Sequence, residues 1–179
     1  MTNALWLMLV QALLGGFDTL YYHEYRARLP AGGARTRPEL VVHALRDFVY
    51  AILFISLPFF DWRGTWALVL GALIVIEIVL TMTDFVLEVG TRGPAGVAAG
   101  ERVTHGLMAI VYGAVLACLA PVLLAWFRAP SALALGARNV PPGLCTTLLV
   151  LGAGVALSGA RDLYAACGLP GGDYPYQRR

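Results

Sequence analysis

Two twelve-residue segments of this chain carry a glutamate, a histidine and a tyrosine in the same register. They are ELVVHALRDFVY at 39–50 and ERVTHGLMAIVY at 101–112. Residues four apart in a helix project from one face, so Glu39 lies beside His43, and Glu101 lies beside His105. A carboxylate next to an imidazole is half of a metal site, and two copies predict two half-sites that meet. The tyrosine seven residues after each histidine returns to the same face.

Each Glu-His segment is preceded along the chain by a helix that ends in further ionisable residues. Asp84 and Glu88 are four apart, so both can face the second Glu-His pair. Asp18 and His23 are five apart, about 140° around a regular helix, so they cannot both point straight at one centre. We therefore expect His23 to bind metal, and Asp18 either to bind it as well or to orient the histidine.

The predicted metal ligands lie at one depth, at the same ends of their helices. They are Asp18, His23, Glu39, His43, Asp84, Glu88, Glu101 and His105, with Asp162 as a further group that would complete or support the shell. Four or more carboxylates would neutralise two divalent ions, so we expect two metals. Because carboxylates and imidazoles are the donors and thiolates are missing, we expect iron, with zinc and manganese as alternatives.

A purely electrostatic interpretation of these acids is also open. Five arginines would be close enough to form salt bridges in place of a metal: Arg26, Arg46, Arg92, Arg102 and Arg161. Asp47 and Glu77 would lie deeper, each either as a partner of Arg46 or as a ligand. The duplicated Glu-x-x-x-His pattern, with its matching tyrosine, favours metal binding over salt bridges alone.

In its ligand layout the pattern resembles the di-iron carboxylate proteins of the ferritin-like kind. In those proteins four helices supply carboxylates and histidines to two metals, so the resemblance implies a four-helix bundle around a dinuclear centre. The spacing differs, because those proteins use Glu-x-x-His whereas this chain has Glu-x-x-x-His. The resemblance covers the arrangement of ligands only and identifies no specific family.

The elements that must position these residues are membrane-spanning helices. Of 179 residues, 59% are hydrophobic and 13% are charged, about half the charged fraction usual in soluble domains. The apolar residues form blocks close to the ~20 residues that cross a bilayer. The predicted spans are 4–22, 40–60, 66–89, 103–127 and 144–166. The predicted fold class is therefore an all-α integral membrane protein with five transmembrane helices.

The first two spans form a hairpin that the next two repeat. We expect one membrane-embedded domain over 1–179, with the repeat at 4–60 and 66–127, a fifth helix at 144–166 and an irregular tail at 167–179. An even number of crossings separates the two copies, so their two-fold axis should run along the membrane normal. The two hairpins would form a four-helix bundle to which the fifth helix is added.

The leading functional hypothesis is a membrane-embedded dinuclear metal enzyme. With iron it would be an oxidoreductase that acts on a lipid-soluble substrate, and Tyr50 and Tyr112 would supply hydrogen bonds or a redox-active phenol. With zinc it would hydrolyse an ester or an amide, with Asp47 as general base. Helix packing is the alternative role for both tyrosines. A metal-ion or small-solute transporter, which would require a homodimer, and a structural partner subunit are the hypotheses from other classes.

The expected partners are the lipid bilayer and a lipid-soluble substrate. A net charge of +2 gives no reason to expect nucleic acid. Cys118, Cys145 and Cys167 are scattered over apolar or small-residue positions, which argues against disulfides and against a thiolate metal site. The sequence carries no nucleotide, haem or flavin motif that would indicate another cofactor.

The arginines orient the chain, because cytoplasmic loops of membrane proteins are enriched in basic residues. Nine lie in the loops or end on one side, namely Arg26, Arg28, Arg35, Arg37, Arg92, Arg102, Arg161, Arg178 and Arg179, and three on the other, namely Arg63, Arg128 and Arg138. We therefore expect the N-terminus outside and the C-terminus in the cytoplasm, in a bacterial inner membrane.

This orientation can be tested by thiol labelling of single cysteines in a background without the native ones. An impermeant reagent applied to intact cells should label Arg63→Cys and leave Arg92→Cys unlabelled until the membrane is opened. The reverse pattern would show that the chain is inserted the other way round.

Overall fold

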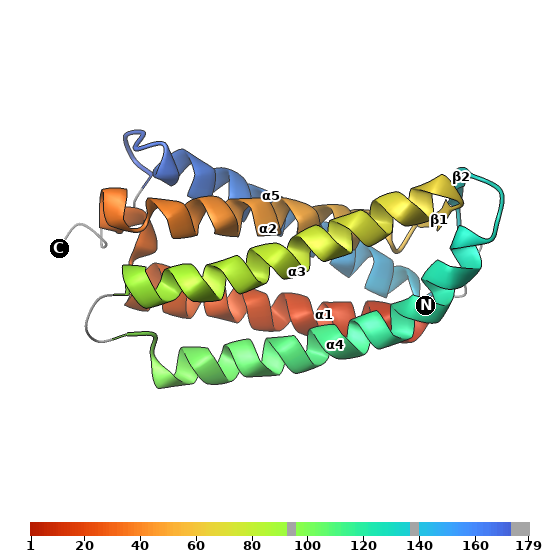
Figure 1. Ribbon diagram of the computed structural model, residues 1–179, viewed down its shortest axis with the longest axis horizontal. Helices are drawn as coiled ribbons and strands as arrows, with labels where there is room; N and C mark the ends of the chain where they lie inside the picture. The colour runs from red at the N-terminus through yellow and green to blue at the C-terminus, as the bar shows by residue number, and fades with distance from the viewer. Residues whose placement is uncertain (93–95, 137–139, 173–179) are drawn as a thin grey trace.

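The computed structural model describes residues 1–92, 96–136 and 140–172, and it is mostly helical, as predicted. Five long helices in the described residues run side by side (Figure 1): α1 (Thr2–Phe17), α2 (Arg37–Ser56), α3 (Thr65–Thr91), α4 (Ala99–Phe127) and α5 (Pro142–Ala166). Shorter elements connect them: the π-helix η1 (Asp18–Arg26), the 3₁₀ helix η2 (Leu29–Arg35) and the strands β1 (Phe60–Arg63) and β2 (Ala132–Leu135). Residues 173–179 of the predicted irregular tail lie outside the described residues, as does Arg138.

The distribution of side chains between interior and surface is that of a membrane-embedded protein. Charged groups are buried, and large apolar ones face outward: Val86, Val89 and Ile110 are more than 70% exposed, whereas Glu39 and Asp84 are at most 1% exposed. Four helical segments are long and apolar enough to cross a bilayer: Thr2–Arg26, Thr65–Thr91, Ala99–Phe127 and Pro142–Ala166. Lipid is the solvent that such a surface fits.

Helix α2 is not among those four segments, although the sequence predicts a span at 40–60. Its first half carries Arg37, Glu39, Arg46 and Asp47, which lower its mean hydropathy. It nevertheless lies alongside the other helices and has the most extensive packing of any, against α5 (Figure 1). A fifth transmembrane span therefore stays a prediction.

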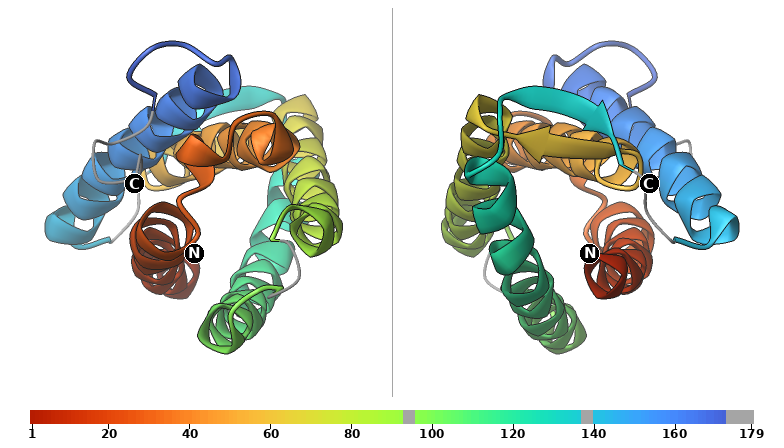
Figure 2. Two further views of the ribbon diagram at one scale, coloured as in Figure 1. Left: turned by 90° about the vertical axis from the view of Figure 1, so that its left-hand side faces the viewer. Right: turned by 90° about the vertical axis from the view of Figure 1, so that its right-hand side faces the viewer.

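The five helices form a ring when viewed along the bundle (Figure 2). Helix α1 packs against α4, α4 against α3, α3 against α2, α2 against α5, and α5 against α1. The predicted two-fold axis would exchange α1 with α3 and α2 with α4, and so would convert the α1–α4 contact into the α2–α3 contact. Both contacts are present, and the superposition of the two hairpins stays a prediction.

The two ends of the bundle are stabilised in different ways. The half nearest the N-terminus contains an apolar core in which Leu5, Leu57, Leu70 and Leu148 are almost fully buried. At this end β1 pairs with β2 as a two-stranded antiparallel sheet, with Trp62 opposite Leu133, although α3 and α4 separate the two strands in the sequence. The pairing satisfies backbone groups that the chain would otherwise leave without partners between helices.

Glycines allow α2 and α5 to approach closely. A Cβ atom at Gly159 would lie 2.8 Å from Cβ of Asp47 and 3.0 Å from the carbonyl oxygen of Ala44, closer than packed atoms tolerate. At Gly154, on the same helix, a Cβ atom would meet nothing within 4 Å. Residue size at Gly159 therefore determines the α2–α5 spacing and, through α2, the position of the ionisable groups beside it.

We expect Gly159→Ala to destabilise the folded protein in detergent, because overpacking a close helix contact costs about 1–3 kcal/mol. Gly154→Ala is the matched control and should leave the unfolding midpoint unchanged or slightly raised, since alanine favours helix. Thermal or denaturant unfolding followed by circular dichroism measures both. Equal midpoints for the two variants would contradict the proposed close approach.

Candidate metal centre

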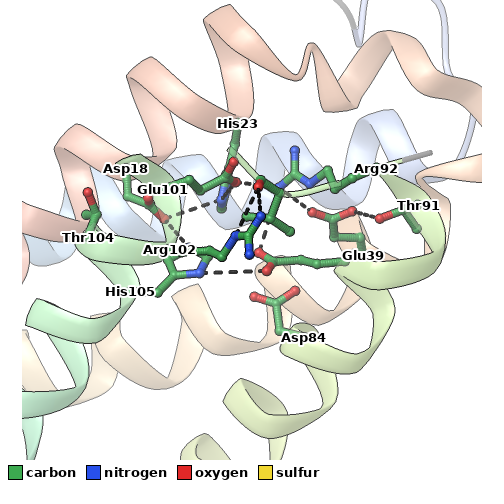
Figure 3. Close-up of polar contacts among 12 residues, drawn as sticks. Asp18, His23, Glu39, Asp84, Thr91, Arg92, Glu101, Arg102, Thr104 and His105 are labelled. Atoms are coloured by element: carbon green, nitrogen blue, oxygen red, sulfur yellow. Dashed lines mark hydrogen bonds and ion pairs between the residues drawn. The ribbon is translucent and has the colours of Figure 1, made fainter. Parts of the chain in front are cut away.

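The eight predicted metal ligands come together at one end of the bundle. They lie on η1, at the start of α2, at the end of α3 and at the start of α4, and all eight are at most 9% exposed. Figure 3 shows Asp18, His23, Glu101 and His105 converging with residues of α3, and Glu39 approaching from α2. The acids and histidines are separated by up to 87 residues in the sequence, so the fold assembles this group.

Two groups of these residues have ligand atoms close enough to share an ion. Glu39, His43, Asp84 and Glu88 form the first group, and each offers one donor atom within 4.8 Å of all the others. It joins α2 to α3 and is completely buried. The Asp84/Glu88 pair thus faces the first Glu-His pair, whereas the sequence predicted that both residues face the second; only Glu88 also reaches the second pair, because α3 packs against α2 here. We call this group cluster 1.

The second group joins η1, α3 and α4. It contains His23, Glu88, Glu101 and His105, whose donor atoms also lie within 4.8 Å of one another. Glu88 belongs to both groups, so the two share a carboxylate. We call this group cluster 2. Two buried clusters of acids and histidines that can hold metal ions are therefore present, as the sequence predicts.

The π-helix resolves the spacing problem of Asp18 and His23. In a π-helix the backbone hydrogen bond joins residues five apart, so side chains at that spacing lie on one face. Segment η1 begins at Asp18, and Nε2 of His23 lies 3.3 Å from Oδ2 of Asp18. The expectation that the two diverge holds only for a regular α-helix. Here the extra residue per turn directs both inward.

Several atoms that converge in the clusters make no hydrogen bond within the described residues. They include Nε2 of His23, Nε2 of His43, Oδ1 of Asp84 and Oε1 of Glu88. Nε2 of His43 lies 3.0 Å from Oδ1 of Asp84, and Nε2 of His23 lies 3.4 Å from Oε1 of Glu101. Donors bound to one metal at about 2.0–2.1 Å are separated by about 3.0–3.4 Å. Both spacings fit ligands of a cation, and the His43–Asp84 pair has no hydrogen bond on either atom, whereas Oε1 of Glu101 also accepts from Arg92.

The imidazole of His105 is oriented by Asp18. Its Nε2 is 3.1 Å from Oδ2 of Asp18, whereas its Nδ1 is directed toward Glu88, 3.7 Å from Oε2. A proton on Nε2, donated to the aspartate, leaves the lone pair of Nδ1 for a metal. Carboxylates commonly hold metal-binding histidines in this way. Asp18 belongs to neither cluster of possible ligands, and its contact with Nε2 of His105 favours the orienting role on that histidine.

Arginines enter the site from two sides. Arg46 donates to Oδ2 of Asp84 at 2.5 Å, which leaves Oδ1 for His43 and cluster 1. Arg92 lies between the clusters, 2.7 Å from Oε1 of Glu39 and 2.8 Å from Oε1 of Glu101. The salt bridges considered from the sequence thus exist for these two arginines. A separate pair joins Arg161 to Glu24, outside both clusters.

These guanidinium groups do not balance the charge of the site. Five carboxylates, from Asp18, Glu39, Asp84, Glu88 and Glu101, meet two arginines, Arg46 and Arg92. With neutral histidines the group retains three negative charges in a buried environment. Buried charge without a partner is strongly unfavourable, so the site favours additional cations.

The remaining predicted residues lie next to the clusters. Asp162 is buried, belongs to neither cluster and lies 3.7 Å from Arg161. Asp47 is half-buried and borders the same cavity as Asp162. Tyr50 and Tyr112 approach each other, with ring centroids 6.0 Å apart, and neither belongs to a cluster. Glu77 lies deeper, where it accepts a hydrogen bond from Thr81.

Several side-chain contacts around the clusters were not predicted from the sequence. Sequence reasoning did not predict that Thr91 donates to Glu39, or that His23 and His43 stack with ring centroids 4.5 Å apart. Nor did it assign Arg92 a position between two glutamates. The helical spacing of Glu88 and Arg92, four apart, was the available signal.

The burial of the Arg92 side chain also affects the thiol-labelling test of membrane orientation. The exposed Arg35, at the same end of the bundle, is the better position for the cysteine in that test.

Comparison with protein-family models, with curated proteins and with solved structures gives no match. The function must therefore be argued from the residues and their geometry.

We expect Asp18→Asn to weaken metal binding about 10–100-fold, the usual effect of changing a group that orients a metal-bound histidine. The ligands themselves would remain, so metal content should recover at saturating metal. Asp61→Asn, which changes a buried acid at the opposite end of the bundle, is the control. Titration of apo-protein with Fe²⁺, Mn²⁺ or Zn²⁺ in detergent measures both affinities. Equal affinities for the two variants would show that Asp18 does not orient a ligand.

Proposed function

We propose that this chain is a membrane-embedded enzyme with a dinuclear metal centre, one ion in each cluster. The observation that carries the proposal is that Glu88 belongs to both clusters. A carboxylate with two oxygens can bridge two ions, and a shared ligand keeps those ions close together. Two isolated salt-bridge networks would not require a common residue.

The donor set favours iron or manganese over a structural zinc ion. Both clusters contain only carboxylates and imidazoles. Structural zinc sites use mostly thiolates, whereas carboxylate–histidine sets suit redox metals and open catalytic sites. We propose iron, and with it an oxidoreductase that acts on a lipid-soluble substrate, because the surrounding surface is apolar.

The protein's own residues would prepare the site for this chemistry. Arg46 and Arg92 reduce its negative charge, and Arg46 holds Oδ2 of Asp84, so Oδ1 of Asp84 can bind metal. The helices exclude bulk water from cluster 1, where every member is buried. A bound iron pair would supply the redox chemistry. Tyr50 and Tyr112, one to two turns deeper, would donate hydrogen bonds or a phenolic electron.

A zinc-dependent hydrolase is the second candidate, and one observation favours it. Asp47 borders the same cavity as His23 and His43, so a carboxylate outside the clusters is available as general base. A transporter is less well supported, because the half of the bundle beyond the site is an apolar core. Metal identity separates the two enzyme classes.

The membrane arrangement forms part of the proposal. We propose that α2 crosses the bilayer as a fifth span and that the two hairpins are a tandem repeat. The clusters would face the cytoplasm of a bacterium, because arginines gather at their end of the bundle: Arg26, Arg28, Arg35, Arg37, Arg92, Arg102 and Arg161. A homodimer remains compatible with this arrangement.

The proposal is tested by the metal content of protein purified in detergent, measured by mass spectrometry. We expect two ions per chain in the wild type. His43→Ala and His105→Ala should each lower this to about one or to none, since each removes a donor from a different cluster.

Glu24→Gln is the matched control, because Glu24 is a buried acid at the same end that pairs with Arg161 and belongs to neither cluster. It should keep both ions. If His43→Ala and His105→Ala also kept both, the histidines would be packing residues and the assignment would be wrong. Iron in the wild type supports the oxidoreductase, and zinc supports the hydrolase.

A further inference from the structure

A cavity of about 420 Å³ lies beside the clusters. Its walls come from α1, η1, α2 and α5, with Met108 of α4, and they include His23 and His43. Its volume lies within the range of about 300–1,000 Å³ that is typical of small-molecule sites. The cavity therefore places a bound molecule directly next to two of the predicted ligands.

The cavity is elongated along the bundle. On α2 it extends from His43 to Phe54, and on α5 from Val150 to Asp162. At 1.5 Å per residue these stretches are about 17 Å long. A cavity of this volume and length is narrow, and a single extended hydrocarbon chain fits it better than a compact or two-chain lipid does.

Small residues line the side of the cavity between α1 and α5, two helices that are neighbours in the ring (Figure 2). They are Gly15 and Gly16 of α1 and Gly154 of α5, and Gly16 and Gly154 are exposed. A Cβ atom at any of the three would meet nothing within 4 Å. In a membrane this side faces lipid, so a chain can enter from the bilayer without passing through water.

Polar groups are concentrated at the end of the cavity nearest the clusters. Asp47, Ser158 and Asp162 line this end, whereas Phe54 and Val150 line the other. Such a division fits an amphiphile, with its headgroup beside the histidines and its chain in the apolar part. Burial of each methylene contributes about 0.8 kcal/mol in water, and less for a ligand that arrives from lipid.

Gln11 is a polar group in the chain region of the cavity. It borders the cavity, is 7% exposed, and its Oε1 has no hydrogen-bond partner within the described residues. It lies seven residues before Asp18, about 10 Å along the helix, so a headgroup beside the histidines does not reach it.

The charges at the polar end select the headgroup. Asp47 and Asp162 line this end of the cavity outside both clusters, and the nearby guanidinium groups are engaged by other acids, Arg46 by Asp84 and Arg161 by Glu24. A carboxylate or phosphate headgroup would lie against the carboxylates of Asp47 and Asp162. A hydroxyl or an amine can instead donate a hydrogen bond to these acids.

We propose that this cavity binds a single-chain lipid whose headgroup is a hydrogen-bond donor without negative charge, a long-chain alcohol or amine. The lipid enters between α1 and α5 and presents its head carbon to His23 and His43. That this lipid is the substrate rests on the proposed metal enzyme. That the cavity binds a lipid rests on the cavity alone.

The test uses full-length, metal-replete protein in lipid nanodiscs and a hexadecanol that carries a photoactivatable diazirine in its chain. Irradiation should crosslink it to α1 and α5, at peptides that contain residues lining the cavity. Unlabelled hexadecanol or hexadecylamine should compete at least tenfold better than hexadecanoate. The two competitors distinguish an alcohol from an amine as the preferred headgroup.

Gly154→Leu extends a side chain into the cavity from a position where an added Cβ atom meets nothing within 4 Å, so the fold should be retained. It should reduce crosslinking at least tenfold and leave two ions per chain. Gly113→Leu is the matched control, because Gly113 is an exposed helical glycine with the same free space and does not line the cavity. It should crosslink like the wild type.

The two proposals fail separately. Full metal content with crosslinking that is spread over the lipid-facing surface, or is unchanged in Gly154→Leu, overturns the lipid site and leaves the metal centre standing. Specific crosslinking in a chain that never binds metal overturns the enzyme and leaves the lipid site. Better competition by hexadecanoate than by hexadecanol overturns the assigned headgroup.

Discussion

Compensation of buried negative charge is the constraint on which this structure depends. Five carboxylates gather at one end of an apolar bundle, where insertion of even one charge costs about 2.5–3.5 kcal/mol. Arg46 and Arg92 reduce the cost, and Arg46 does so while Oδ1 of Asp84 still faces cluster 1. Bound cations would complete the compensation, so metal binding and folding of this end should be coupled.

The architecture separates the tasks of stability and chemistry. Apolar side chains and the β1–β2 sheet stabilise the end of the bundle near the N-terminus, where Leu5, Leu70 and Leu148 are fully buried. At the other end polar groups replace this packing, and the close α2–α5 contact at Gly159 holds the helix that carries cluster 1. A rigid apolar half allows the other half to contain groups that would destabilise a smaller core.

The π-helical turn and the cavity are connected through η1. The turn directs Asp18 and His23 inward, and the same two residues border the cavity between α1, α2 and α5. A regular helix at this point would rotate one of them toward lipid. Such π-helical turns are commonly found at functional sites, because they redirect side chains without breaking backbone hydrogen bonds.

Sequence periodicity by itself determined the helical, membrane-embedded class and the two pairs Glu39/His43 and Asp84/Glu88, which depend only on the four-residue spacing of regular helices. That these two pairs meet in cluster 1 was decided by the packing of α2 against α3. Periodicity could not determine cluster 2 fully, since His23 reaches it through a π-helix that no local pattern specifies. Tertiary structure alone decided that Asp18 orients His105 across 87 residues and that Arg92 lies between two glutamates. Those contacts depend on which helices are neighbours in the ring, and helix packing is not encoded in the spacing along any single helix.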